Sequence, residues 1–208
     1  MDTFVLILEL IGTVAFAASG AIVAIRKKMD IFGVAVLALV TSVGGGMIRD
    51  MLLGVTPPAT FRDPVYAVTA IVVSLVVFIP PVRHYLAGTH AAYQRDMLVM
   101  DSLGLGVFTA VGVSLAYAAQ PGAGIFLSTF IGVLSGVGGG ILRDVLAGDT
   151  PYIFIKHVYA CASLDGDLAC SLIWRQTGQA YAMVIGAAIV VLIRMLSAIY
   201  KWNLPRAD

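Results

Sequence analysis

Two arginine–aspartate pairs, Arg49-Asp50 and Arg143-Asp144, lie within otherwise apolar sequence. Each pair belongs to a fourteen-residue motif that occurs twice, beginning with Gly-Gly-Gly and ending with Thr-Pro, with nine positions identical. A charge at bilayer depth costs roughly 3 kcal/mol or more and marks a pathway or a structural ion pair, and both interpretations remain open. Neighbouring helical residues point about 100° apart, so we expect pairing between the copies, Arg49 with Asp144 and Arg143 with Asp50.

The motif opens on three consecutive glycines inside an apolar helix, at a cost on the order of 1 kcal/mol each relative to alanine. The six glycines are Gly44, Gly45, Gly46, Gly138, Gly139 and Gly140. Close helix packing is one explanation. Unwinding is the other, because a broken helix exposes carbonyls that coordinate cations and is tolerated only inside protein or along a watery cavity. Since both copies precede an arginine–aspartate pair, we predict two broken helices that line a pathway.

Glu9 and Asp101 form a second pair of equivalent acids, each three residues before a glycine, Gly12 or Gly104. They either neutralise a basic group near a membrane face or belong to a cation vestibule, and the residues do not separate these interpretations. Asp165 and Asp167 have no counterpart in the first half, and their spacing of about 200° places them on different sides of one helix.

Composition predicts a membrane protein. Apolar residues make up 60% of the 208 residues and charged residues 12%, about half the usual charged fraction of a soluble domain. A formal charge of +1 argues against a nucleic-acid partner. No metal-ligand cluster, catalytic triad or paired-carboxylate pattern occurs, so we expect neither an enzyme nor a cofactor. No linker divides the chain, which predicts a single transmembrane domain over 1–208, in contact with membrane lipids.

Segments of about 20 apolar residues can cross a bilayer as helices. Seven segments qualify and predict an all-α membrane protein: 4–25, 31–53, 64–82, 97–119, 123–147, 153–174 and 179–200.

The repeated motifs divide these seven helices into two copies and an addition. Repeat one covers about 4–82, repeat two about 97–174, and the extra helix about 179–200. Three helices per copy is an odd number, so the second copy must enter the membrane from the opposite side. Inverted repeats of this kind place a pathway or binding site at their interface.

Basic residues in the loops predict the orientation. Two of them, Arg62 and Arg175, lie on one side. Eight lie on the other side: Arg26, Lys27, Lys28, Arg83, Arg95, Lys156, Lys201 and Arg206. We therefore expect a multi-pass protein of a cell membrane with the N-terminus outside and the C-terminus in the cytoplasm.

The doubled GGGx[IL]RDxLxGxTP motif, in a three-plus-three arrangement with a seventh helix, resembles the trimeric intracellular cation (TRIC) channel family. The similarity is greatest to its prokaryotic branch of glycine-transporter-domain proteins and covers roughly 4–200. This resemblance implies a homotrimer in which each protomer has its own hourglass pore, permeable to monovalent cations, K⁺ foremost. Arg143-Asp144-Val145 occupies the place of a Lys-Glu-Val motif in animal members, and arginine is not a simple substitute for lysine.

Two functional hypotheses follow. The first is a K⁺-permeable channel gated or constricted at Arg49 and Arg143, whose transient ligand is the permeant K⁺, or Na⁺. The second is a secondary transporter for a small zwitterion such as glycine, with Arg49 and Asp144 binding its carboxylate and its ammonium group.

Overall fold

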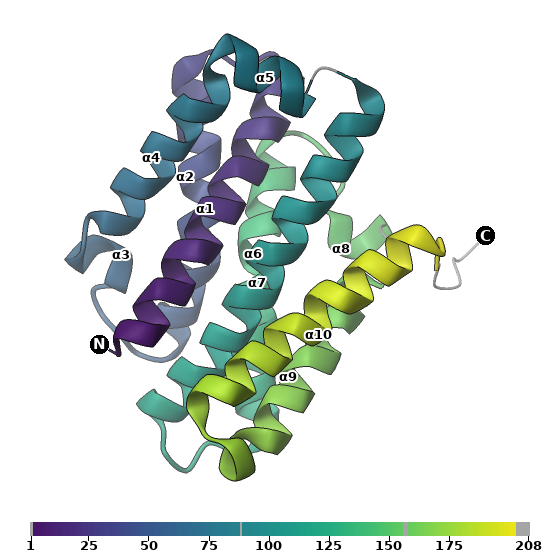
Figure 1. The fold of residues 1–208 in the computed structure, drawn as a ribbon. Helices are drawn as coiled ribbons and strands as arrows, with labels where there is room; N and C mark the ends of the chain where they lie inside the picture. Colours follow the sequence, from purple (N-terminus) through teal and green to yellow (C-terminus); the bar gives the residue numbers. More distant parts are fainter. Residues whose placement is uncertain (1, 88, 156–157, 203–208) are drawn as a thin grey trace.

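The computed structural model describes residues 2–87, 89–155 and 158–202. Within this part the chain forms helices joined by short turns (Figure 1). Their order is α1 (Thr3–Arg26), α2 (Ile31–Leu52), α3 (Ala59–Arg62), α4 (Val65–Phe78), α5 (Pro80–Ala87), α6 (His90–Ala119), α7 (Ile125–Leu146), α8 (Tyr152–Ile155), α9 (Tyr159–Thr177) and α10 (Gln179–Ile199).

Side-chain caps fix the first residues of three long helices. Asp2, Asp30 and Thr89 each accept a hydrogen bond from a backbone N–H in the first turn of α1, α2 and α6. Such caps satisfy donors that have no partner inside the helix. The α6 helix starts at His90, seven residues before the predicted segment, because Thr89 caps it there.

Among the residues that the structure describes, five helices are long and apolar enough to cross a membrane: α1, α2, α6, α7 and α10. The α4–α5 pair counts as a sixth span if the two are joined across their 85° bend. The predicted segment 64–82 is therefore divided, because a second short helix begins at Pro80. The remaining predicted segment corresponds to α8 and α9, and α9 carries Asp165 and Asp167. Of the loop charges, Lys156 and Arg206 lie outside the described residues.

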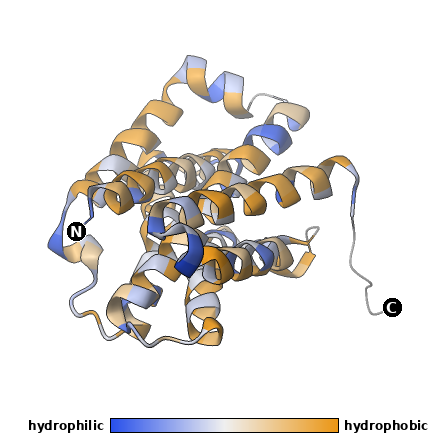
Figure 2. Cartoon of the chain, turned by 60° about the horizontal axis from the view of Figure 1, so that its bottom comes forward, coloured by the Kyte–Doolittle hydropathy of each residue, from blue (hydrophilic) through white to orange (hydrophobic). Residues whose placement is uncertain are grey.

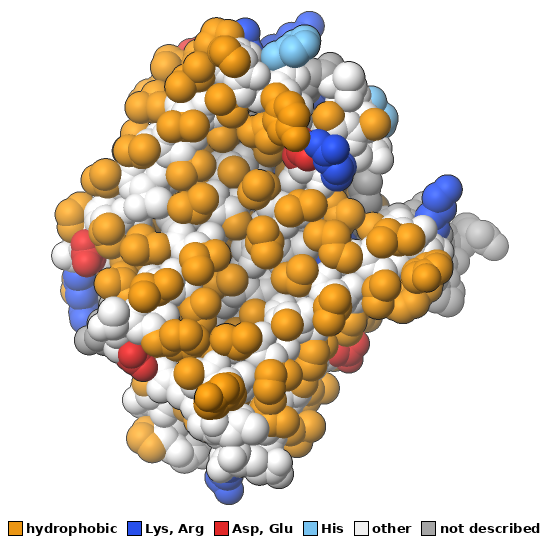
Figure 3. Space-filling model, in the orientation of Figure 1, with side chains coloured by type: hydrophobic (Ala, Val, Ile, Leu, Met, Phe, Trp, Pro, Cys, Tyr) orange, Lys and Arg blue, Asp and Glu red, His pale blue; other side chains and the backbone are white. Residues whose placement is uncertain are grey.

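The hydropathy of the helices and their surface both fit lipid as the surrounding solvent. Apolar residues dominate the long helices, as Figure 2 shows, and apolar side chains cover the face in Figure 3, with charged side chains mainly at its margins. Exposed side chains include Phe32, Phe126 and Leu172, which are 75%, 86% and 60% accessible. Water would disfavour such a surface, whereas a bilayer hides it.

The two halves of the chain pack against each other through reciprocal contacts. Phe16 of α1 stacks on Phe108 of α6, with ring centroids 5.4 Å apart. Gly104 lies against the Phe16 ring, which a Cβ at this position would overlap, and Gly12 lies against the Phe108 ring, 3.0 Å from where its Cβ would stand. The long α6 packs on α1, α7 and α10 and thereby joins the first half to the last helix.

Candidate functional site

The glycine runs lie inside continuous helices, so the predicted breaks at Gly44–Gly46 and Gly138–Gly140 are wrong. Residues 31–52 and 125–146 are helical throughout. The glycines allow α2 and α7 to cross at backbone contact. A Cβ on Gly45 would overlap the carbonyl oxygen of Ser135, and a Cβ on Gly139 would overlap the carbonyl oxygen of Thr41. Packing is therefore what these two glycines provide.

The other four glycines have graded surroundings. A Cβ on Gly44 would meet the Leu142 side chain, and one on Gly138 would stand 3.1 Å from the Cα of Gly45. On Gly46 the added atom would lie 3.6 Å from the Arg49 guanidinium, its nearest neighbour. On Gly140 it would lie 3.8 Å from the Arg143 guanidinium but only 2.9 Å from the Tyr159 hydroxyl oxygen. The last glycine of the first run therefore leaves space beside its arginine, whereas that of the second run does not.

Arg49 is held in a buried network of the first half. Its Nη1 lies 3.3 Å from Glu9 Oε1 on α1, and its Nε donates to Asp50 Oδ1 at 2.8 Å. Tyr66 of α4 donates its hydroxyl to Glu9 Oε2 at 2.6 Å. The three charged residues are only 2–4% exposed. One arginine therefore binds two carboxylates beneath the protein surface.

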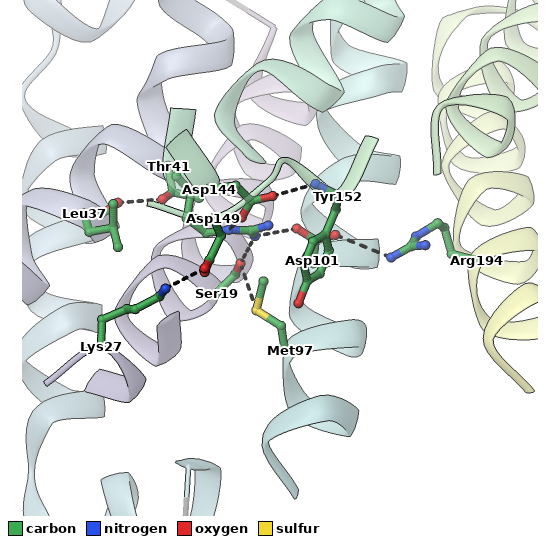
Figure 4. A network of polar contacts seen from close by, with 11 residues as sticks. Ser19, Lys27, Leu37, Thr41, Met97, Asp101, Asp144, Asp149, Tyr152 and Arg194 are labelled. Atoms are coloured by element: carbon green, nitrogen blue, oxygen red, sulfur yellow. Dashed lines mark hydrogen bonds and ion pairs between the residues drawn. The ribbon is translucent and has the colours of Figure 1, made fainter. Parts of the chain in front are cut away.

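Arg143 is the centre of an equivalent network in the second half, of which Figure 4 labels Ser19, Asp101 and Asp144. Its Nη1 donates to Asp101 Oδ1 of α6 at 2.6 Å and also to the Ser19 hydroxyl of α1. Its Nε donates to Asp144 Oδ1 at 2.8 Å. A second arginine, Arg194 of α10, places Nη2 3.6 Å from Asp101 Oδ2. Arg143 and Asp101 are completely buried.

The predicted pairing between copies, Arg49 with Asp144 and Arg143 with Asp50, is wrong. Each arginine turns its Nε to the aspartate next to it and reaches with Nη1 the acid on the first helix of its own copy. An arginine side chain is flexible enough to bend back to the neighbouring aspartate. The expectation from the angle of about 100° between neighbouring helical residues did not take this into account. Glu9 and Asp101 are therefore counter-ions of basic groups, one of the two roles considered for them.

The second oxygen of each motif aspartate caps a short helix. Asp50 Oδ2 accepts from the Ala59 amide at the start of α3, and Asp144 Oδ2 accepts from the Tyr152 amide at the start of α8, at 2.8 and 2.9 Å. Between arginine and cap the chain turns at a glycine with positive φ, 71° in one copy and 72° in the other. The motif thus specifies a crossing, an ion pair, a turn and a cap.

Several residues of these networks were not predicted from the sequence. Tyr66 binds Glu9, the Arg143 guanidinium lies 5.4 Å from the Tyr152 ring, and the Arg194 guanidinium lies 4.6 Å from the Tyr159 ring. Arg194 could have been predicted from the sequence, because an arginine within an apolar span indicates a partner inside the protein. Aromatic residues give no such indication in an apolar sequence.

Cavities adjoin the Arg49 network. One of about 20 Å³ is lined by residues of α1, α2, α3 and α4, among them Glu9, Arg49 and Tyr66. A larger one of about 220 Å³ is lined by Glu9, Arg49, Asp50 and apolar residues at the ends of α2 and α6. Glu9 and Arg49 line both, so the network lies where the two cavities meet.

The two arginine networks lie toward opposite ends of α1. Arg49 contacts this helix at Glu9 and Arg143 contacts it at Ser19, ten residues or about 15 Å further along. Asp167 is buried and Asp165 exposed, which confirms that these two acids face different sides of α9. Within the described residues, neither acid forms an ion pair with an arginine of the two networks.

The fold and site together define a multi-pass helical membrane protein that buries an arginine between two carboxylates in each half. A family described as "Glycine transporter" matches residues 6–80 and 98–175. The chain is 40% identical over 200 residues to a UPF0126 membrane protein of Deinococcus radiodurans, covering 95% of this chain and 89% of the relative. It is 38% identical over 200 residues to the UPF0126 inner membrane protein YadS of Escherichia coli, covering 95% and 92%.

Solved structures extend this similarity. A TRIC orthologue from Rhodobacter sphaeroides superposes with a TM-score of 0.87 at 33% identity, covering 96% of this chain and all of that one. A prokaryotic TRIC channel in 0.5 M KCl superposes with 0.88 at 30% identity, covering 98% and 100%. The chain therefore belongs to the prokaryotic TRIC family.

Proposed function

We propose that this protein is a channel for monovalent cations, K⁺ foremost, with one pathway in each protomer of a homotrimer. The observation that carries this proposal is similarity along almost the whole chain to prokaryotic TRIC channels, with TM-scores of 0.87 and 0.88. The buried charge networks supply what such a pathway needs, because intramembrane ionisable residues line ion routes or brace them.

The pathway in this proposal runs between two inverted copies of three helices, with α10 as a seventh, added span. Reciprocal contacts support the two-fold relation: Phe16 meets Phe108, and the contact of Gly45 with Ser135 has its counterpart in Gly139 with Thr41. Contacts that exchange residues in this manner are typical of two-fold interfaces. The two family-matched segments, 6–80 and 98–175, also correspond to the two copies.

In this proposal continuous helices line the pathway. We therefore assign control of cation passage to the arginines. A fixed positive charge 4 Å from a permeant cation repels it by about 4 kcal/mol at an effective dielectric near 20, unless an acid compensates it. Arg49 and Arg143 are 2% and 0% exposed, and each is held in place by two carboxylates. We assign the arginines the role of constrictions or gates, and Asp50 and Asp144 the role of positioning them.

The alternative is a transporter for a small zwitterion such as glycine, and the description of the matching family favours testing it. That hypothesis placed Arg49 and Asp144 in one site, where they would bind a carboxylate and an ammonium group. In the structure Asp144 binds Arg143, and Arg49 binds Glu9 and Asp50. The site expected for a zwitterion is therefore not formed by these two residues.

Paired assays distinguish the two functions. Purified protein is fused into planar bilayers under a KCl gradient, and the same preparation is tested for glycine uptake in proteoliposomes, with empty vesicles as the control. A channel gives unitary currents that reverse near the K⁺ potential and no uptake above the control. Glycine accumulation driven by an ion gradient, without unitary currents, would reject the channel.

Assembly and orientation require separate measurements. Native mass spectrometry in mild detergent is expected to give three copies of the 21.8 kDa chain. A reporter fused to the C-terminus is expected to be active in the cytoplasm of a bacterial host, in accord with the loop charges. A stable dimer, or a C-terminus outside the cell, would contradict these parts of the proposal.

A further inference from the structure

A cavity of about 20 Å³ lies against Glu9; five of its ten lining residues carry oxygen in their side chains, and Arg49 is among the other five. This volume holds one water molecule or one ion of similar size. Besides the Glu9 carboxylate, hydroxyl groups of four residues line it: Thr13, Ser42, Thr60 and Tyr66. Oxygen ligands of this kind can replace the hydration shell of an alkali cation.

Three of these hydroxyls already donate their protons to oxygen atoms of the protein. Thr13 Oγ1 donates to the Glu9 carbonyl at 2.7 Å, and Ser42 Oγ donates to the Leu39 carbonyl at 3.0 Å. Tyr66 donates to the Glu9 carboxylate. A hydroxyl that has donated its proton keeps only lone pairs to offer. The cavity lining is therefore biased toward accepting, which suits a cation.

The charged groups beside the cavity do not balance. Glu9 and Asp50 are carboxylates, Arg49 is one guanidinium, and all three are nearly fully buried. Their formal charge is −1. An uncompensated charge away from water is unfavourable, and a monovalent cation in the adjoining cavity removes the imbalance.

The second copy of the repeat serves as an internal comparison. There Asp101 and Asp144 face two arginines, Arg143 and Arg194, so the formal charge is zero. The positions equivalent to Thr13 and Ser42 are Leu105 and Gly136, which offer no hydroxyl. The network of the second copy thus forms without a surplus charge and without these two hydroxyl groups. The surplus negative charge and the two hydroxyls belong to the Glu9 network and not to its counterpart.

An ion can approach Glu9 through the larger cavity. Glu9, Arg49 and Ala59 line both cavities, and Leu53 and Leu115 belong to the larger one, of about 220 Å³. Apart from Glu9, Arg49 and Asp50, the residues that line the larger cavity are apolar. Glu9 supplies the carboxylate that lines both cavities, and Arg49, 3.3 Å from it, lines both as well.

We propose that the cavity at Glu9 binds one dehydrated monovalent cation, K⁺ or Na⁺, with the carboxylate as charge partner and Thr13, Ser42 and Tyr66 as neutral ligands. The site rests on the proposed function, since it is a place where an ion pauses on its pathway. A surplus of one negative charge matches a monovalent ion and not a divalent one. The equivalent region at Asp101 binds no such ion.

Binding is tested on the purified protein without any measurement of current. Crystals are soaked in Tl⁺ or Rb⁺ and the anomalous density is located. In parallel, thermal unfolding in detergent is followed while KCl or NaCl replaces N-methylglucamine chloride at constant ionic strength. We expect one anomalous peak at Glu9, none at Asp101, and a saturable rise in unfolding temperature with K⁺ or Na⁺ but not with N-methylglucamine.

Three variants assign the binding to this cavity. Glu9→Gln keeps the shape and removes the charge, and should abolish both the peak and the saturable rise. The double variant Thr13→Val with Ser42→Ala keeps the carboxylate and should raise the half-saturating K⁺ concentration at least tenfold. Thr129→Val, a buried threonine on α7, removes a hydroxyl elsewhere and should change neither readout.

The outcomes separate this inference from the channel proposal. Absence of the peak in wild-type crystals, or equal stabilisation by N-methylglucamine, rejects the site even if bilayers show K⁺ currents. An unchanged half-saturation in the double variant also rejects it. Cation binding that persists in a protein without currents retains the site and rejects the channel.

Discussion

Gly45 of α2 and Gly139 of α7 cross with their backbones in contact: a Cβ on Gly45 would stand 3.2 Å from the Gly139 amide nitrogen and overlap the Ser135 carbonyl. The neighbouring Gly46 has no such restriction, since its added Cβ would lie 3.6 Å from the flexible end of Arg49. Two adjacent glycines of one motif therefore have opposite tolerances, which gives a matched pair of substitutions.

We expect Gly45→Ala to lower stability by about 1–3 kcal/mol or more, because a backbone carbonyl cannot move aside as a side chain can. Gly46→Ala should be neutral or stabilising by up to about 1 kcal/mol, since alanine favours a helix over glycine. Thermal unfolding of each variant in detergent compares the two. Equal effects of the two substitutions would show that the helices do not cross at Gly45.

Arg49→Ala and Arg143→Ala test the gating role. Removing either guanidinium changes the balance of charge that a permeant cation meets on the pathway, so single-channel recordings should show altered K⁺ conductance or open probability. Arg175→Ala, on the exposed side of α9, is the matched control and should leave the current unchanged. If both buried variants assemble and conduct like wild type, the arginines are structural braces and not gates.

Asp144 performs two tasks that substitutions can separate. Asparagine at this position still accepts from the Tyr152 amide but lacks the charge that binds Arg143, whereas alanine loses both. We expect the unfolding temperature to be highest for wild type, lower for Asp144→Asn and lowest for Asp144→Ala. The free energies of unfolding of the two variants should differ by about 1 kcal/mol, the usual contribution of a helix cap. Identical temperatures for the two variants would mean that the cap contributes nothing.

Gly54 and Gly148 of the motif lie in the left-handed region, with φ of 71° and 72°. An L-residue there is strained by roughly 1–2 kcal/mol, so Gly54→Ala and Gly148→Ala should each lower the unfolding temperature. Gly122→Ala is the control, because this glycine has an ordinary φ and open space around it. A loss of stability in the control as large as in the two variants would refute this explanation.

The sequence by itself determined where the helices lie and which residues carry charge inside them. Helix positions depend on local apolar length and on caps such as Asp30 and Thr89, so the predicted segments agree with the helices to within a few residues at most ends. The doubled motif likewise determined which positions are equivalent between the halves. Asp165 and Asp167 face different sides of α9, as helical periodicity required.

The tertiary structure decided what each of these residues contacts. Sequence spacing could not show that α2 and α7 cross at Gly45, and therefore could not tell a packed glycine from a broken helix. It could not show that Arg143 reaches Asp101, or that Arg194 of α10 joins them. Partner choice depends on distances between helices that are remote in the chain, and those distances are set when the whole bundle packs, not by any local pattern.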